Sequence, residues 1–293
     1  MAHTFSFMQP GGAHAAFLLR WAPVMAGLLA LYVPTYVSLA HGAWNDEQNA
    51  HGPLILLVVM WLLWQMRDRL LALPENGAWL SGAVVMVAGL LLYILGRTVE
   101  IIYFDAFSQL LVVAGVLLAV FGWSAIRVLW FPLVFMLFLV PLPGVLVDAM
   151  TGPLKQMVSY LAENILYDLG YPISRSGVVL TIGQYQLLVA DACSGLNSLY
   201  SLTALGMLFL HITYDGNPVR TAIVLASIWP IAFAANIVRV LSLVLITYYF
   251  GDESGQGFMH NFSGMLLFVI ALGLLYFVHA LTGQAWKWAK AIR

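Results

Sequence analysis

The chain has 293 residues, of which 62% are hydrophobic and 9% are charged, with a formal net charge of -1 and a mean hydropathy of +0.91. Soluble domains carry about 25% charged residues, so this composition excludes a soluble globular protein and indicates an integral membrane protein. The sequence also lacks the basic blocks that nucleic-acid binding requires, and a single cysteine excludes an internal disulfide.

Long apolar runs predict one all-α polytopic membrane domain over residues 1–293, with about eight transmembrane helices. A hydrocarbon core of about 30 Å needs about 20 apolar residues per helix. Because the N-terminus has no Lys or Arg ahead of its apolar run and no small-residue cleavage site, we expect the first span to remain. The expected spans lie near residues 18–40, 52–66, 78–96, 106–124, 128–147, 195–213, 221–249 and 261–281.

The distribution of Lys and Arg in the short loops predicts the orientation of these spans. Cytoplasmic loops of membrane proteins carry an excess of both residues. If the N-terminus is cytoplasmic, that side collects Arg67, Arg69, Arg127, Arg220, Lys287, Lys290 and Arg293, whereas the outer side has Arg97, Lys155 and Arg175. We therefore expect both termini to be cytoplasmic.

One long connection, residues 148–193, is expected on the outer side between the fifth and sixth spans. Its first half, PLKQMVSYLAENILYDLG, has apolar residues at helical spacing and predicts an amphipathic helix lying on the membrane. Its second half, SGVVLTIGQYQLLVADAC, is rich in β-branched and aromatic residues around a glycine and predicts a small β-hairpin. The connection delivers Cys193 to the outer surface.

Three residues near the outer ends of the last three spans are candidates for chemistry. Cys193 stands before the sixth span, Arg239 lies inside the seventh, and His260 precedes the eighth. An ionisable residue within a span indicates function by default, and a thiol near a helix N-terminus and a cation is activated as a nucleophile. Each residue alone also has a structural reading: a packing thiol, a snorkelling arginine and an interfacial histidine.

The motifs around these residues are DACSGL at 191–196, NIVR at 236–239 and MHNFSG at 259–264. In this order on three consecutive late spans, they resemble the motifs of the exosortase/archaeosortase family. The segment HGAWNDEQNAHGPLILL resembles the family's first outer loop, and FLVPLPG resembles the end of its middle span. The motifs resemble those of the B subtype of exosortase.

The resemblance implies a multi-pass cysteine transpeptidase or protease of the bacterial inner membrane, with its active site on the periplasmic side. Its partners would be exported proteins with a C-terminal sorting signal, made of a Pro-Glu-Pro motif, a transmembrane helix and a basic tail. Matching positions give Cys193 as the nucleophile, Arg239 as its electrostatic partner and His260 as the acid/base. The family implies no cofactor and no metal, and the molecule that accepts the cleaved protein is not specified.

Further residues are candidates for substrate binding. An acidic residue in the sorting motif would favour an outer cation, for which Arg97 and Arg175 are available. Glu47 and His51 in the first outer loop and Asn236 near Arg239 complete the set. Each of the two arginines also reads as an ordinary interfacial charge, and histidine at a membrane boundary is often an anchor.

A transporter of small solutes or anions is the main alternative. In it, Arg239 would bind the anion. Transporters often show internal repeats and binding sites at the midplane, whereas this sequence has no evident repeat and Arg239 is expected off the midplane. Zinc and serine proteases are disfavoured because the H-E-x-x-H and G-x-S-x-G motifs are absent.

Overall fold

The computed structural model describes residues 11–291, except 46–48, 50, 189–194 and 215. Its contacts cluster into two compact units, one formed by residues 1–50 with 75–122 and the other by 51–74 with 123–293. The single domain expected over residues 1–293 remains a prediction.

Apolar helices dominate the described residues, as the composition predicts. Five of the described helical segments are long and apolar enough to cross a membrane: Trp21–Asn45, Trp79–Val99, Ile102–Phe121, Pro218–Phe250 and Gly264–Gln284. Two apolar helical segments, Trp130–Leu139 and Tyr200–Thr213, are shorter. The total of about eight spans therefore stays a prediction, while the helical membrane architecture is confirmed.

The first unit contains α1 (Gly11–His41), the short 3₁₀ helix η1 (Ala43–Asn45), α3 (Trp79–Val99) and α4 (Ile102–Phe121). A stripe of buried glycines, Gly82, Gly89 and Gly96, runs along α3 at intervals of seven residues and faces α4. Glycine lets two helices in a membrane approach closely. A Cβ at Gly89 would lie 2.8 Å from Val112 Cγ2 and 2.9 Å from Val112 N, so this hairpin depends on the missing side chain.

We expect Gly89→Leu to destabilise the protein. The substitution stabilises the helix by about 1 kcal/mol through its propensity. Overpacking of this kind costs about 1–3 kcal/mol, and the backbone of α4 cannot move out of the way of the new side chain as a flexible side chain could. The midpoint of thermal unfolding in detergent should fall. Gly273→Leu is the matched control, because a Cβ at Gly273 meets nothing within 4 Å; equal midpoints for the two variants would contradict the close approach.

The second unit begins with α2 (Gly52–Leu71) and continues after residue 122 with α5 (Trp123–Val128), α6 (Trp130–Phe135) and the 3₁₀ helix η2 (Met136–Leu139). The single span expected at 128–147 is therefore divided into short helical pieces. Pro141 and Pro143 explain the end of this run, because proline has no N–H for the helical ladder and restricts the residue before it. Pro143 instead caps the next helix, α7 (Gly144–Asp168).

An antiparallel meander of three strands follows α7: β1 (Ile173–Ser176), β2 (Val179–Ile182) and β3 (Tyr185–Leu188). The expected hairpin corresponds to β2 and β3, and β1 is an additional strand. Pairing of Ser176 with Val179 and of Ile182 with Tyr185 leaves two-residue turns. Gly177 and Gly183 open these turns at φ 63° and 56°, a conformation that glycine adopts without strain.

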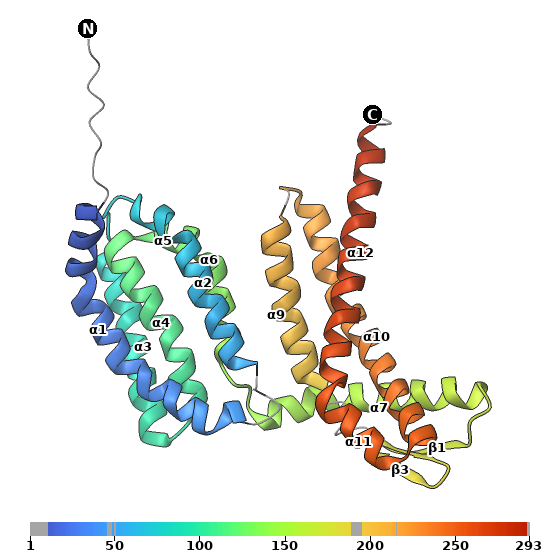
Figure 1. The fold of residues 1–293 in the computed structure, drawn as a ribbon. Coiled ribbons are helices and arrows are strands. Elements are labelled where there is room, and N and C mark those ends of the chain that lie inside the picture. The colour runs from blue at the N-terminus through green and yellow to red at the C-terminus, as the bar shows by residue number, and fades with distance from the viewer. Residues whose placement is uncertain (1–10, 46–48, 50, 189–194, 215, 292–293) are drawn as a thin grey trace. The chain divides into compact units, whose positions relative to one another are not determined.

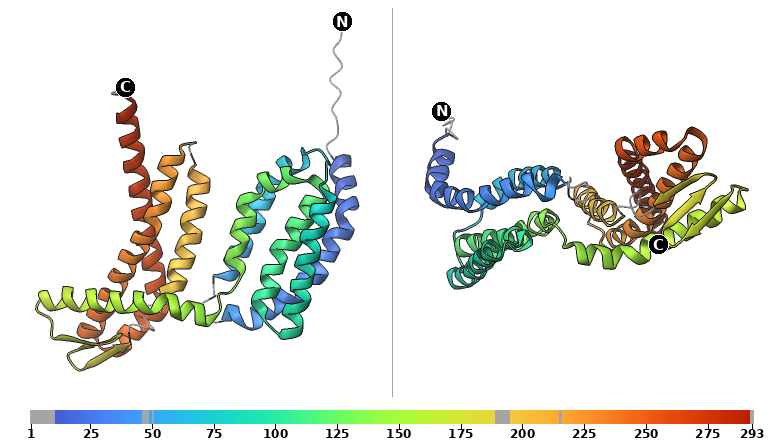
Figure 2. Two further views of the ribbon diagram at one scale, coloured as in Figure 1. Left: turned by 180° about the vertical axis from the view of Figure 1, so that it is seen from behind. Right: turned by 90° about the horizontal axis from the view of Figure 1, so that it is seen from below.

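The meander and α7 form one hydrophobic core with the C-terminal part of α10 (Pro218–Phe250). Leu180 and Ile182 of β2 pack with Val158, Ala162 and Leu166 of α7 and with Val240 and Val244 of α10. Figures 1 and 2 show α7 running across the ends of α9 and α10, beside the strands. The helix expected from the loop sequence is thus present, and it begins at Gly144 rather than at about residue 153.

A bundle of α9 (Gly195–Thr213), α10 and α12 (Ser263–Ala291) completes the unit, with α11 (Asp252–Asn261) connecting the last two. A second hydrophobic core holds the bundle together: Leu202 and Leu210 of α9, Val224, Ile228, Ile231, Ala232 and Ala235 of α10, and Leu267, Ala271 and Leu275 of α12. These residues recur at intervals of three and four, as expected of packed helices.

Candidate functional site

Arg239 lies on α10 where the buried face of this helix passes from one hydrophobic core to the other. Ala235 belongs to the core of the bundle, and Val240 belongs to the core formed with α7 and the strands. Between them, Asn236 and Arg239 are the buried polar residues on this face, 2% and 8% exposed. A charge inside a membrane span is costly, about 2.5–3.5 kcal/mol on insertion scales, so its position at this junction favours a functional reading.

The N-terminus of α9 lies level with Arg239. A Cβ at Gly206 of α9 would lie 2.6 Å from Ile228 Cδ1 of α10, which fixes the register of these two antiparallel helices. Gly195, the first residue of α9, lies eleven residues before Gly206, and Arg239 lies eleven residues after Ile228. Because both helices rise about 1.5 Å per residue, α9 begins beside the turn of α10 that carries Arg239.

The N-terminus of α12 reaches the same level. Arg220 Nη2 donates a hydrogen bond to the backbone oxygen of His279 at 2.7 Å, which fixes the register of α10 and α12. Ser263, the first residue of α12, lies sixteen residues before His279, and Asn236 lies sixteen residues after Arg220. Two helix N-termini, which carry partial positive charge and unsatisfied N–H groups, therefore lie beside Asn236 and Arg239.

Cys193 lies outside the described residues, two positions before α9. His260 is the penultimate residue of α11, and its side chain also lies outside the description. The backbone of α11 is held against α10, because buried Gly255 packs directly on Thr247. The structure thus places Arg239 and the backbone of His260 near one end of the bundle, and it leaves the distances among the three candidate side chains untested.

His51 lies near the N-terminal part of α9. It caps the start of α2, and its ring contacts the ring of Tyr200, one to two turns into α9, with centroids 5.7 Å apart. Burial lowers the pKa of His51 below its ordinary value, which favours the neutral imidazole. Tyr200 was not among the sequence candidates; its hydroxyl donates to the backbone oxygen of Leu137 at 2.8 Å and anchors α9 to η2.

Arg175 lies on β1 in the same unit as Arg239. Its Nε donates to Glu163 Oε2 of α7 at 3.0 Å, its Nη1 donates to the backbone oxygen of Gly177 at 2.9 Å, and its guanidinium lies 5.6 Å from the ring of Tyr160. Both members of the ion pair keep about a quarter of their side-chain surface exposed. Such a pair contributes little to stability and leaves donors of Arg175 accessible.

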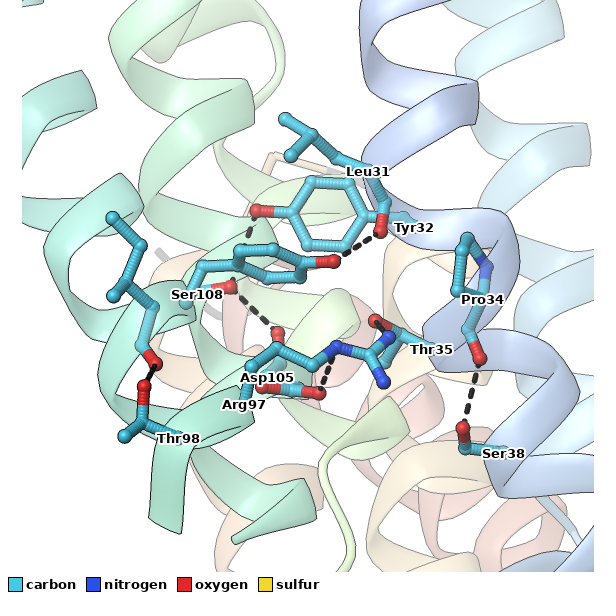
Figure 3. Close-up of polar contacts among 11 residues, drawn as sticks. Leu31, Tyr32, Pro34, Thr35, Ser38, Arg97, Thr98, Asp105 and Ser108 are labelled. Atoms are coloured by element: carbon cyan, nitrogen blue, oxygen red, sulfur yellow. Dashed lines mark hydrogen bonds and ion pairs between the residues drawn. The ribbon is translucent and has the colours of Figure 1, made fainter. Parts of the chain in front are cut away.

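Arg97 lies in the other unit and is held within a buried polar cluster. Its Nε lies 2.9 Å from Asp105 Oδ2 of α4, and its Nη2 donates to Thr35 Oγ1 of α1 at 3.0 Å (Figure 3). Asp105 was not among the sequence candidates. A carboxylate inside the apolar run that forms α4 is the feature that could have identified it. Glu47, the remaining substrate-binding candidate, lies outside the described residues.

These features define a class of protein: a multi-pass helical membrane protein with a buried arginine beside two converging helix N-termini. The sequence model of the family described as transmembrane exosortase (Exosortase_EpsH) matches residues 43–277. The chain therefore belongs to the transmembrane exosortase family, as the motifs predict, while the B subtype stays a prediction. The chain matches no curated protein and no solved structure.

Proposed function

We propose that the protein is a membrane-embedded cysteine transpeptidase or protease that cleaves the C-terminal sorting signal of exported proteins through a thioester. Membership of the exosortase family supports a sorting-signal enzyme. The observation that carries the proposal is the register of the bundle, because α9 and α12 both begin level with Arg239. Cys193 and His260 precede these two helices by two and three residues.

In the proposed reaction, the thiolate of Cys193 attacks a peptide carbonyl of the substrate and forms a carbon–sulfur bond. A helix N-terminus and a nearby cation are the features that activate a thiol as a nucleophile. Arg239 stabilises the tetrahedral oxyanion, a contribution of about 3–4 kcal/mol for a preorganised donor. A guanidinium stays protonated in proteins, so Arg239 is excluded as a base.

His260 donates a proton to the departing amine as the carbon–nitrogen bond breaks, which leaves an acyl thioester on Cys193. Water, or an amine or hydroxyl of an acceptor, then attacks the thioester and transfers its proton to His260. This step regenerates the thiolate of Cys193 and releases the cleaved or transferred protein. The chemistry needs no cofactor. We place this site on the periplasmic face of a bacterial inner membrane, with both chain termini cytoplasmic.

For substrate binding, Arg175 is the favoured partner of the acidic residue in a Pro-Glu-Pro motif. Its unit contains Arg239, and the core that holds β1 also holds the residue after Arg239. Glu163 forms an ion pair with Arg175 in the structure, and the carboxylate of a substrate would displace it. His51, Glu47 and Asn236 remain proposed as lining residues.

Trapping of the thioester tests the proposal. Membranes containing the full chain and a tagged protein with the tripartite signal are treated with hydroxylamine, which attacks thioesters. We expect a shortened product with a C-terminal hydroxamate, detected by mass spectrometry and absent with Cys193→Ala. A shortened product with no hydroxamate at any hydroxylamine concentration would exclude the thioester route.

A transporter of small solutes or anions is the alternative function, and buried Arg239 is the observation that favours it. Transport would need Arg239 but would not need Cys193, so the two proposals predict different results for the cysteine variant.

A further inference from the structure

The first unit contains an apolar groove of about 320 Å³ between α1, α3 and α4. Leu28 and Leu31 of α1, Leu90 of α3 and Val112 and Val116 of α4 are among the residues that line it. All three helices are candidate membrane spans, so the groove lies at the depth of the lipid chains. An apolar groove at this depth can take a hydrocarbon chain of a lipid.

Each helix face that lines the groove ends in a polar residue. Residues spaced by four or seven positions share one face of a helix. The pairs of lining and polar residues are Leu31 and Thr35 on α1, Leu90 and Arg97 on α3, and Val112 and Asp105 on α4. Arg97 contacts both Asp105 and Thr35, and it lies seven residues beyond Leu90 on α3. A polar cluster therefore lies about two helical turns beyond one end of the groove.

The guanidinium of Arg97 is positioned by this cluster and remains partly accessible. Asp105 binds Nε, Thr35 binds Nη2, and the ring of Tyr93 lies 5.4 Å from the guanidinium carbon. A guanidinium has five N–H donors, and the side chain of Arg97 is 34% exposed, whereas that of Asp105 is 3% exposed. Figure 3 shows the guanidinium between α3 and Thr35, with Asp105 beside it.

The depth of Arg97 matches the depth of lipid phosphates. It is two residues from the end of α3, and the hydrocarbon boundary lies near the end of a span of this length. Arginine binds phosphate through paired N–H donors. Asp105 is buried and already bound by Nε, so it orients the fork without blocking the exposed donors. Glu100, at the cap of α3, is the nearest other carboxylate along the helix.

We propose that this groove binds one anionic phospholipid, with an acyl chain between α1, α3 and α4 and the phosphate on Arg97. The occupant is assigned from two observations together: partly exposed guanidinium donors near the depth of the lipid phosphates, and an apolar groove at the depth of the lipid chains. This site lies in a different unit from Arg239 and does not depend on the proposed cleavage reaction.

Gly27 provides a variant that fills the groove without disturbing the fold. It lines the groove, and a Cβ there meets nothing within 4 Å, so Gly27→Leu places a side chain where the acyl chain would lie. Gly273→Leu on α12 is the matched control, because its Cβ is equally unobstructed and lies outside the groove. Arg97→Lys keeps the charge that balances Asp105 but removes the paired donors.

Native mass spectrometry of the full chain in detergent, with added phosphatidylglycerol or phosphatidylcholine, tests the proposal. We expect the wild type and Gly273→Leu to retain phosphatidylglycerol preferentially, and Gly27→Leu to lose about tenfold in affinity, or 1.4 kcal/mol. Arg97→Lys should weaken the retention of phosphatidylglycerol, because it removes the paired donors for the phosphate. Equal retention by Gly27→Leu and Gly273→Leu would exclude the groove, and equal retention of both lipids by the wild type would exclude the preference for an anionic lipid.

Discussion

Replacing Cys193 by alanine is expected to abolish C-terminal processing of a co-expressed protein that carries the tripartite sorting signal. Loss of a nucleophile that forms a covalent intermediate typically lowers the rate by more than about 10⁴-fold. The measurement is the fraction of tagged substrate that gains a new C-terminus, followed by gel shift and mass spectrometry. The new C-terminus also identifies the cleaved bond and any attached acceptor.

Two controls separate chemistry from folding in this experiment. Cys193→Ser preserves the size of the side chain, and it should also lose most of the activity because a hydroxyl is a far weaker nucleophile than a thiol at neutral pH. The amount of each variant in the membrane and its unfolding midpoint should match those of the wild type. Processing that survives in Cys193→Ala would reduce the thiol to a packing residue and would favour the transporter.

Replacing Arg239 by glutamine is expected to lower the rate of processing by about 10²–10³-fold, the usual effect of removing one donor that stabilises an oxyanion. The effect should appear in kcat, because the donor acts mainly in the transition state. Arg239→Lys should recover part of the rate, since it restores the charge without the planar fork. Initial rates in membranes, at several substrate levels, provide the measurement.

Arg220→Gln is the matched control for Arg239, because it removes an arginine from the same helix. Arg220 contacts the backbone of His279 near the opposite end of α10, so its loss should lower the unfolding midpoint more than the rate of the folded protein. If Arg220→Gln and Arg239→Gln reduce processing equally at equal amounts of folded protein, Arg239 has no special role in the chemistry.

The helical membrane architecture could be predicted from the sequence because hydropathy is a local property of each segment. The amphipathic α7 and the hairpin of β2 and β3 were predicted for the same reason, from periodicity and from Gly183. The division of residues 128–147 into short pieces was not predicted. Apolar composition alone does not distinguish one long helix from several short ones. Pro141 and Pro143 are the local signal that a helix ends before them.

The order of the three motifs along the chain follows directly from the sequence. The sequence does not show that α9 and α12 begin at the height of Arg239 along the axis of the bundle. That level depends on the register of α9 and α12 against α10, which is fixed by contacts such as those of Gly206 and Arg220. The pairing of Arg97 with Asp105 was missed because an ion pair is a tertiary contact.

The pair formed by Arg97 and Asp105 has a consequence for the biogenesis of the protein. Arg97 lies in the last turn of α3 and Asp105 in the first turn of α4, so each charge alone would oppose insertion by less than the cost of about 2.5–3.5 kcal/mol at the bilayer centre. The two residues are only eight positions apart, on either side of the turn between α3 and α4, and they neutralise each other once this hairpin closes. The ion pair and the glycine stripe therefore both favour the insertion of α3 and α4 as one packed hairpin, because the carboxylate of Asp105 is then buried together with its counter-charge.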